Sequence, residues 1–298
     1  MDWQWTAQAQ PILSPGAKGK WDSSDVLNPS VLEFDGQLLN LYSGFDGKTW
    51  HTGLAVSPDG IAWTKRGKIL SPDPATWEGD YIAANGSELA SNTEVLYWYQ
   101  AGRPPQIGLA RSTNLRDWQK QPKPVLESGP FGSWDERGVA DPCAIRSGKL
   151  LYMFYTGTDR ARRQRLGVAG SLDGITWFKQ RQNPIMELGE YGSFDEGGLG
   201  EPAAWASNGY YWMLYTGRDR KEYRRLGLAC SLDGVHWEKL PKVFAGSEPW
   251  NAKVICDPSV LVEGDRVRVW FGGGDVASPD ENLHGQIGIA ELRPARKN

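Results

Sequence analysis

Three things are scarce in this chain of 298 residues: cysteine, net charge and long apolar runs. The cysteines, Cys143, Cys230 and Cys256, are too few and too scattered for a disulfide framework or a metal knuckle, so we expect buried small side chains in a reducing compartment. A net charge of −3 gives no field that would attract nucleic acid or an anionic membrane surface. No apolar run approaches the ~20 residues of a membrane helix, and the N-terminus lacks a signal-peptide pattern.

These absences favour a cytoplasmic globular protein, although a secreted protein whose signal was removed would share the same pattern. With 40% hydrophobic and 23% charged residues, the chain can bury a large core. We expect no cofactor and no metal ion, and a monomer or a weak homo-oligomer.

The chain contains five similar units. An aromatic residue recurs 56, 57, 60 and 56 residues apart, and in four units a polar residue and a proline follow it, starting seven positions later. In the second unit, Ala84 and Asn85 take the place of that pair. Each unit continues with a strand-like run such as FYTG or LYTG, and the first four then have a turn leading to tryptophan, such as SLDGITW. The recurring aromatic residues are Trp21, Trp77, Trp134, Phe194 and Trp250.

This repeat predicts an all-β fold, a five-bladed β-propeller with four antiparallel strands in each blade. A single domain would cover residues 1–298. The fifth unit stops after its third strand, whereas residues 1–13 match the fourth strand of other units in their tryptophan and their proline-apolar ending. We therefore expect residues 1–13 to complete blade five and close the ring, a match that two stacked β-domains would not explain. The blades would span approximately residues 14–70, 71–126, 127–186, 187–245, and 246–292 with 1–13.

The residue before each proline marks a candidate site, because the innermost strands of a propeller line its central channel. Three carboxylates would converge there, where like charges raise one another's pKa, so that one acid stays protonated while another ionises. Acids at these positions could instead cap the strand starts. A purely structural role would favour one residue type, however, and the types differ. The five equivalent positions hold Asn28, Ala84, Asp141, Glu201 and Asp257.

The YTG runs, the SLDG turns and the Asp-Pro and Glu-Pro strand starts resemble the five-bladed glycosidases related to invertases, levansucrases and arabinanases (glycoside hydrolase families 32, 68 and 43). A more distant likeness is to the family 130 mannoside phosphorylases. The resemblance covers essentially the whole chain and implies an exo-acting glycoside hydrolase that cleaves a small oligosaccharide or glycoside. It also implies that Asp141 in VADP stabilises the transition state or tunes a pKa, and that Glu201 in LGEP is the general acid.

The first unit departs from the family pattern. Many relatives have an aspartate as base or nucleophile where this chain has Asn28, and an amide can do neither task. Asp25 is the expected substitute, because no other unit has an acid at that position, and Asp257 is the second candidate. Alternatively, phosphate is the nucleophile and the enzyme is a phosphorylase. The chain could also be a propeller that binds sugar without catalysis.

Substrate-binding residues are expected on the loops between second and third strands. Arg160 in TDRARRQR and Arg218 in RDRKEYRR could clamp phosphate, a uronate or sugar hydroxyls, or could instead pair with nearby acids. Trp50 is the best candidate for stacking on a sugar, with His51 beside it. His284 in ENLHGQIG should also face the funnel. Further binding candidates are Asn28, Asn85, Arg103 and Asp257.

Overall fold

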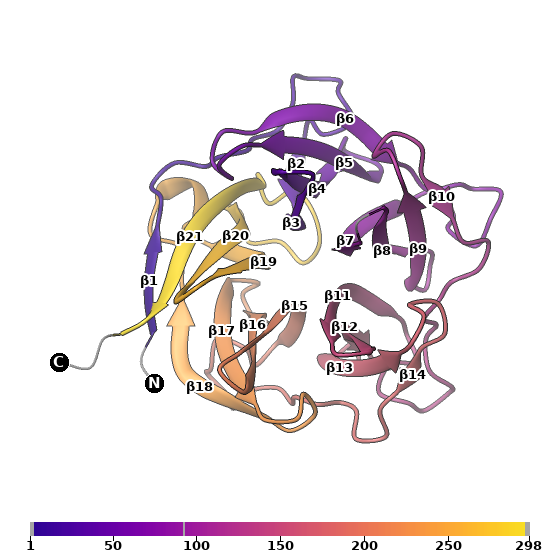
Figure 1. Ribbon diagram of the computed structural model, residues 1–298. Helices are drawn as coiled ribbons and strands as arrows, with labels where there is room; N and C mark the ends of the chain where they lie inside the picture. Colours follow the sequence, from indigo (N-terminus) through magenta and orange to yellow (C-terminus); the bar gives the residue numbers. More distant parts are fainter. Residues whose placement is uncertain (1–2, 92, 296–298) are drawn as a thin grey trace.

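The computed structural model describes residues 3–91 and 93–295, and β-strands arranged around a central axis make up most of it (Figure 1). Strands that follow one another pair antiparallel in groups, which is the architecture of a β-propeller. The helix in the described part is the short 3-10 turn η1 (Pro249–Asn251). No helix in that part is long and apolar enough to cross a membrane.

The groups follow one another along the chain, and each runs from the axis outward (Figure 1). The first contains β2 (Asp25–Leu27), β3 (Val31–Phe34), β4 (Gln37–Phe45), β5 (Trp50–Ser57) and β6 (Thr64–Leu70). The second contains β7 (Ile82–Ala90), β8 (Val95–Ala101), β9 (Gln106–Ser112) and β10 (Gln119–Lys120). The third contains β11 (Val139–Ser147), β12 (Leu150–Thr158), β13 (Gln164–Ser171) and β14 (Phe178–Lys179). The fourth contains β15 (Gly198–Ser207), β16 (Tyr210–Arg218), β17 (Arg224–Ser231) and β18 (Trp237–Phe244), and the last contains β19 (Val254–Glu263), β20 (Arg266–Gly274), β21 (Gln286–Pro294) and β1 (Trp3–Ala7).

The N-terminal strand pairs with the last strand of the chain, as the repeat predicts. Strand β1 runs antiparallel to β21, with Trp3 opposite Pro294 and Ala7 opposite Ala290. The strand order of the last group is therefore β19, β20, β21, β1, and its outer strand comes from the other end of the chain (Figure 1).

The turns that lead to tryptophan dock one group onto the next. Trp98 of the second group donates its indole N–H to the carbonyl of Gly174 in the third group at 2.8 Å, and Trp270 of the last group does the same to Gly60 of the first group at 2.8 Å. Both glycines have left-handed φ angles, 74° and 79°. A Cβ atom at either glycine would lie within 2.8 Å of the visiting indole ring. Glycine is thus required there both by the backbone and by the neighbouring tryptophan.

The acid that directly follows the recurring aromatic residue has a structural role in four groups. Asp135 is 2% exposed, and its Oδ2 atom accepts hydrogen bonds from the Tyr155 hydroxyl at 3.4 Å and from Lys179 Nζ at 2.5 Å. These contacts tie the loop before β11 to β12 and β14, which explains why this part of the repeat is kept. The same arrangement joins Asp22 with Tyr42 and Lys65, Glu78 with Tyr99 and Lys120, and Asp195 with Tyr215 and Lys239.

Apolar side chains pack between neighbouring groups. Leu41 of the first group lies in one cluster with Tyr97 of the second, and Trp212 of the fourth group lies in one cluster with Trp3 and Phe271 of the last. The cysteines are free thiols. Cys256 is buried, as the sequence predicts, whereas Cys143 and Cys230 are only half-buried, so the prediction of burial is wrong for these two.

Candidate active site

Five residues at the starts of the innermost strands share one unusual backbone conformation. Each has a left-handed φ between 47° and 52°, which is uncommon for a residue other than glycine. In β7, β11, β15 and β19 the pairing register shifts at this residue, as in a β-bulge. Bulges redirect a side chain, and here they turn it toward the axis. We call these five the ring residues: Asn28, Asn85, Asp141, Glu201 and Asp257.

The structure corrects the second position of this ring, where Ala84 was expected. Ala84 is fully buried and pairs with Gln100 of the neighbouring strand, whereas the next residue, Asn85, has the left-handed φ of 49°. This group has one more residue between its recurring aromatic and the ring, and Gly86 replaces proline. A Cβ atom at Gly86 would lie 2.4 Å from the carbonyl oxygen of Trp98, so no larger residue fits there.

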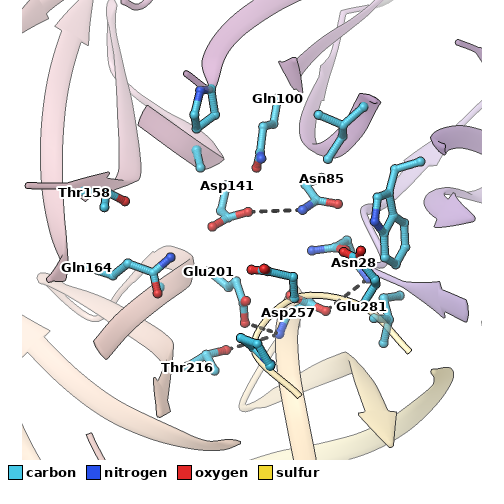
Figure 2. A pocket seen from close by; sticks show the side chains of 18 of the residues that line it. Asn28, Asn85, Gln100, Asp141, Thr158, Gln164, Glu201, Thr216, Asp257 and Glu281 are labelled. Atoms are coloured by element: carbon cyan, nitrogen blue, oxygen red, sulfur yellow. Dashed lines mark hydrogen bonds between the residues drawn. The ribbon is translucent and has the colours of Figure 1, made fainter. Parts of the chain in front are cut away.

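A cavity of about 460 Å³ opens on the axis above the ring (Figure 2). The ring residues form its floor, where a hollow of about 30 Å³ lies among them and the residues that follow them. The walls come from strand ends and loops of every group. They include Trp50, Tyr81, Gln100, Arg103, Thr158, Gln164, Arg218, Arg224 and Glu281.

Asp141 lies beside the two ring residues of neighbouring groups. Its Oδ1 atom accepts a hydrogen bond from Asn85 Nδ2 at 3.4 Å (Figure 2). Burial and the nearby charge of Glu201 raise the pKa of Asp141 to about 7, and hydrogen bonds from Thr156 and Asn85 offset only part of this rise. At neutral pH the Asp141 carboxyl is therefore poised between its two protonation states.

Glu201 and Asp257 form a pair next to one buried cation. The backbone N–H of Asp257 donates to Glu201 Oε2 at 3.2 Å, and Arg224 Nη1 lies 4.0 Å from Glu201 Oε1. Burial and then the charge of Glu201 raise the pKa of Asp257 well above its ordinary value. The Cys256 thiol also donates a hydrogen bond to Asp257 Oδ2 at 3.0 Å. The buried Arg224 guanidinium is thus the cation nearest to Glu201, and Asp257 holds its proton more tightly than an exposed aspartate does.

The same cluster has three potential metal ligands but not the chemistry of a metal site. Glu201, Cys256 and Asp257 place one potential ligand atom each within 4.8 Å of one another. Burial and the charge of Asp257 raise the pKa of the Cys256 thiol well above its usual range, and a protonated thiol is a poor metal ligand. Arg224 already supplies a positive charge there. The raised pKa of the thiol and the neighbouring guanidinium therefore make this cluster a poor fit for a metal ion.

Asp25, the expected base, does not line the cavity. Its side chain is completely buried, Oδ1 accepts the backbone N–H of Gly285 at 2.7 Å, and Oδ2 accepts that of Asn282 at 2.6 Å. A carboxylate held by two backbone donors and shielded from solvent cannot approach a substrate. Asp25 instead fixes the loop before β21, which explains why an acid occurs in this group alone.

Three predicted binding residues also lie outside the cavity. Arg160 pairs with Glu136 at 2.9 Å, so the alternative of pairing with a nearby acid holds for it. His284 is exposed and its Nδ1 lies 2.7 Å from Asp275. His51 is buried against Trp21, and burial and the charge of Lys68 lower its pKa.

The other predicted binding residues do line the cavity. Asn28, Asn85 and Asp257 belong to its floor, and Trp50, Arg103 and Arg218 to its walls. Trp50 is only 5% exposed, because it stacks on Phe45 with ring centroids 4.8 Å apart, so it offers an edge rather than an open platform. Arg218 is already committed to Gln164 at 2.6 Å and Glu222 at 3.3 Å. Arg103 is exposed and stacks on the Tyr81 ring at 4.0 Å.

The cavity wall also contains Glu281, which the sequence did not single out, and Arg224 from the RDRKEYRR loop that was expected to face the funnel. Glu281 accepts a hydrogen bond from the Tyr81 hydroxyl at 2.6 Å, and Arg224 donates to the carbonyls of Ser278 and Pro279 at 3.0 and 2.7 Å. The loop between β20 and β21 thus bends over the cavity. This loop is longer than the equivalent loops after β12 and β16, and that extra length was the feature of the sequence that could have indicated it.

Comparison with known proteins places this architecture among carbohydrate-active enzymes. The model of the glycosyl hydrolases family 32 N-terminal domain matches residues 105–257. An uncharacterized protein of Mycobacterium tuberculosis is 27% identical over 71% of this chain and 75% of its own length. A 1,2-beta-oligomannan phosphorylase of Thermoanaerobacter sp. is 32% identical over 39% of this chain and 42% of its own length.

Solved structures share the fold across nearly the whole chain. A glycoside hydrolase matches with a TM-score of 0.78 at 16% identity, covering 98% of this chain and 94% of the other. The beta-1,2-mannobiose phosphorylase from Listeria innocua matches with a TM-score of 0.76 at 11% identity, covering 97% and 96%. Hydrolases and phosphorylases are thus both built on this fold.

Proposed function

Because this chain belongs to the family of the glycosyl hydrolases family 32 N-terminal domain, we propose that it is an exo-acting glycoside hydrolase that cleaves a terminal bond of an oligosaccharide or glycoside. The observation that carries the proposal is the convergence of Asp141, Glu201 and Asp257 on the floor of one cavity. Two of these acids have raised pKa values, so they hold their protons to higher pH than exposed aspartates do. Cleavage of a glycosidic bond needs such a proton for the leaving oxygen.

In this proposal, Glu201 donates the proton to the leaving oxygen. Its Oε2 accepts the backbone N–H of Asp257, a buried acid whose pKa is raised well above its ordinary value. Asp141 tunes this proton through its own charge and accepts a hydrogen bond from a sugar hydroxyl. The loop that carries Glu281 closes one side of the cavity, which supports action at the end of a sugar chain.

We also propose that the chain is one domain and that its strand groups are the five blades of a single propeller. The pairing of β1 with β21 and the docking of Trp98 and Trp270 onto neighbouring groups support this.

A phosphorylase is the second candidate, and two observations favour it. With Asn28 an amide and Asp25 buried, the first group supplies no carboxylate base to the cavity floor, and burial and the charge of Glu201 raise the pKa of Asp257, the second candidate. The acids Asp280 and Glu281 of the wall lie on the loop before β21, where Glu281 accepts the Tyr81 hydroxyl. Arg103 lies in the wall with no carboxylate within 4.0 Å among the described residues. A phosphate ion could take the place of the missing base and bind near this guanidinium.

The test is a screen of aryl furanosides, aryl pyranosides and β-1,2-linked mannobiose, with and without phosphate. Release of free sugar without phosphate supports the hydrolase, and phosphate-dependent formation of a sugar phosphate supports the phosphorylase. Glu201→Gln keeps the shape but cannot donate a proton, so we expect a rate loss on the order of 10²–10⁴ on substrates with poor leaving groups and a smaller loss on activated aryl glycosides. Equal rate losses on substrates with poor and with good leaving groups would show that Glu201 is not the general acid. If the protein binds sugar but turns over none of the substrates, it is a sugar-binding propeller and not an enzyme.

A further inference from the structure

Two neighbouring groups each present an exposed aromatic ring on the side of the cavity mouth. Phe131 lies in the loop before β11 and Tyr191 in the loop before β15, and the two side chains are 86% and 84% exposed. These loops lie at the same ends of the strands as Thr158 and Gly198, which line the cavity. Single exposed apolar side chains are common on protein surfaces, but these two rings occupy equivalent positions in neighbouring groups.

In the third group, the ring is held in place by a charged pair. The Cζ atom of Arg160 lies 3.9 Å from the centroid of the Phe131 ring. Arg160 Nε donates to Glu136 at 2.9 Å, and the Glu136 carboxylate also accepts the backbone N–H of Gly132. The Glu136 side chain is 7% exposed, so a nearly buried anion fixes a guanidinium that in turn orients the ring.

The fourth group repeats this construction sixty residues later in the sequence. Arg220 Cζ lies 4.7 Å from the centroid of the Tyr191 ring, and Arg220 Nε lies 3.2 Å from Glu196. The Glu196 carboxylate accepts the backbone N–H of Gly192 at 3.1 Å. The same fixed aromatic ring is thus built twice on adjacent groups.

The remaining groups lack this feature. Three positions before the recurring aromatic residue they have Lys18, Pro74 and Ser247 in place of Phe131 and Tyr191. The aromatic ring is therefore not a requirement of the repeated fold. It occurs only in the two groups that also supply Asp141 and Glu201.

A hollow beside the first ring has the chemistry that a sugar needs. It measures about 420 Å³, begins at Gly132, the residue after Phe131, and is also lined by Ser133 and the ion pairs Arg160–Glu136 and Arg163–Asp159. The N–H groups and carboxylate oxygens of these pairs can also bond to sugar hydroxyls. A sugar ring stacks its C–H face on an aromatic ring while its hydroxyls bond to polar side chains at the edge.

We propose that Phe131 and Tyr191, with Arg160 and Arg220, form a second carbohydrate-binding surface that holds a neutral polysaccharide or a long oligosaccharide outside the axial cavity. The choice of a carbohydrate rests on the proposed function. The binding itself requires no turnover, so the two proposals can fail separately.

The experiment is native gel electrophoresis of the full chain through gels that contain a soluble mannan, a levan or an arabinan. We expect at least one polysaccharide to retard the wild-type protein. The double variant Phe131→Ala/Tyr191→Ala should bind it about five- to tenfold more weakly. Tyr191→Phe, which keeps the ring, should behave like the wild type, as should Glu201→Gln, which changes only the cavity.

The matched control is the double variant Leu172→Ala/Leu232→Ala. These two leucines are 75% and 71% exposed and recur in the same two groups, but they lie in the turns after β13 and β17, at the opposite ends of the strands. Their removal should leave retardation unchanged. The proposal is overturned if none of the three polysaccharides retards the wild type, or if Phe131→Ala/Tyr191→Ala is retarded equally. It is also overturned if size-exclusion chromatography shows that this variant converts a wild-type dimer to a monomer, because the surface would then bind a second copy.

Discussion

The carboxylate of Glu201 accepts the backbone N–H of Asp257 at 3.2 Å, and this contact joins the starts of β15 and β19 at the floor of the cavity. Burial and the charge of Glu201 raise the pKa of Asp257 well above its ordinary value. Arg224, 4.0 Å from Glu201, is the cation beside this pair. The pH dependence of activity should therefore depend on Glu201, Asp257 and Arg224 together.

Arg224→Met should remove the buried positive charge, so that the nearby carboxyl groups keep their protons to higher pH. We expect the acidic limb of the pH-rate profile to move to higher pH, and the free energy of unfolding to fall by about 1–3 kcal/mol, because the carbonyls of Ser278 and Pro279 lose their donor. Chemical denaturation and a pH-rate series measure the two effects. Arg225→Met is the control, since Arg225 pairs with Asp219 at 3.4 Å and does not line the cavity. Equal effects of both substitutions would contradict a special role for Arg224.

Asp141→Asn should stabilise the protein at alkaline pH while it lowers activity. The pKa of Asp141 is raised to about 7 in the folded protein, against 3.8 for an unperturbed aspartate, so the folded state holds this proton more tightly than the unfolded chain. The wild type therefore loses stability as the pH rises through about 7, and carries no such cost below about 3.8. We expect a gain on the order of 1–3 kcal/mol at pH 8 and almost none at pH 4.

Thermal denaturation of the wild type and Asp141→Asn at both pH values checks this prediction. Asp173→Asn is a control of opposite sign, because hydrogen bonds from the backbone N–H groups of Thr176 and Ile175 lower the pKa of Asp173 to about 2. That substitution should destabilise the protein at pH 8. A gain for Asp141→Asn that is the same at every pH would show that titration of this residue is not its cause.

Asp25→Asn should act on stability more than on chemistry. An amide cannot accept hydrogen bonds from both Gly285 and Asn282, so we expect a loss of about 1–3 kcal/mol and a fall in kcat of no more than about tenfold. The melting temperature and kcat should be measured on the same preparation. An unchanged melting temperature with a loss of kcat of about 10³ or more would restore Asp25 to the role of base.

The sequence located four of the ring residues because proline follows each of them. It placed the remaining one at Ala84 rather than Asn85, because Gly86 replaces proline and the spacing is one residue longer. The role of Asp25 could not be predicted, since its hydrogen-bond partners lie more than 250 residues away in the sequence. The strand pairing of β1 was predictable, because it follows from a repeated pattern, whereas the bend of the loop over the cavity depends on contacts that no repeat encodes.

Deletion of residues 1–7 should open the last group. Trp3 is buried against Trp212, with ring centroids 5.0 Å apart, and β1 covers the edge of β21. Loss of a buried tryptophan costs about 3–5 kcal/mol, and an uncovered strand edge promotes association. Light scattering and thermal denaturation should show a less stable protein that aggregates. Gln4→Ala, on the exposed face of the same strand, should change neither, and a deletion variant that stays monomeric at the wild-type melting temperature would contradict the prediction.

The shared left-handed conformation of the ring residues separates the scaffold from the chemistry of the floor. The backbone aims each of these five side chains at the axis whether it is an amide or an acid, and φ stays between 47° and 52° in every case. At each position the main chain thus sets the direction of the side chain, while the type of side chain can differ. Amides at the first two positions and carboxylates at the other three give the floor a neutral side and an acidic side. Proton donors would therefore approach a bound sugar from one side of the cavity only.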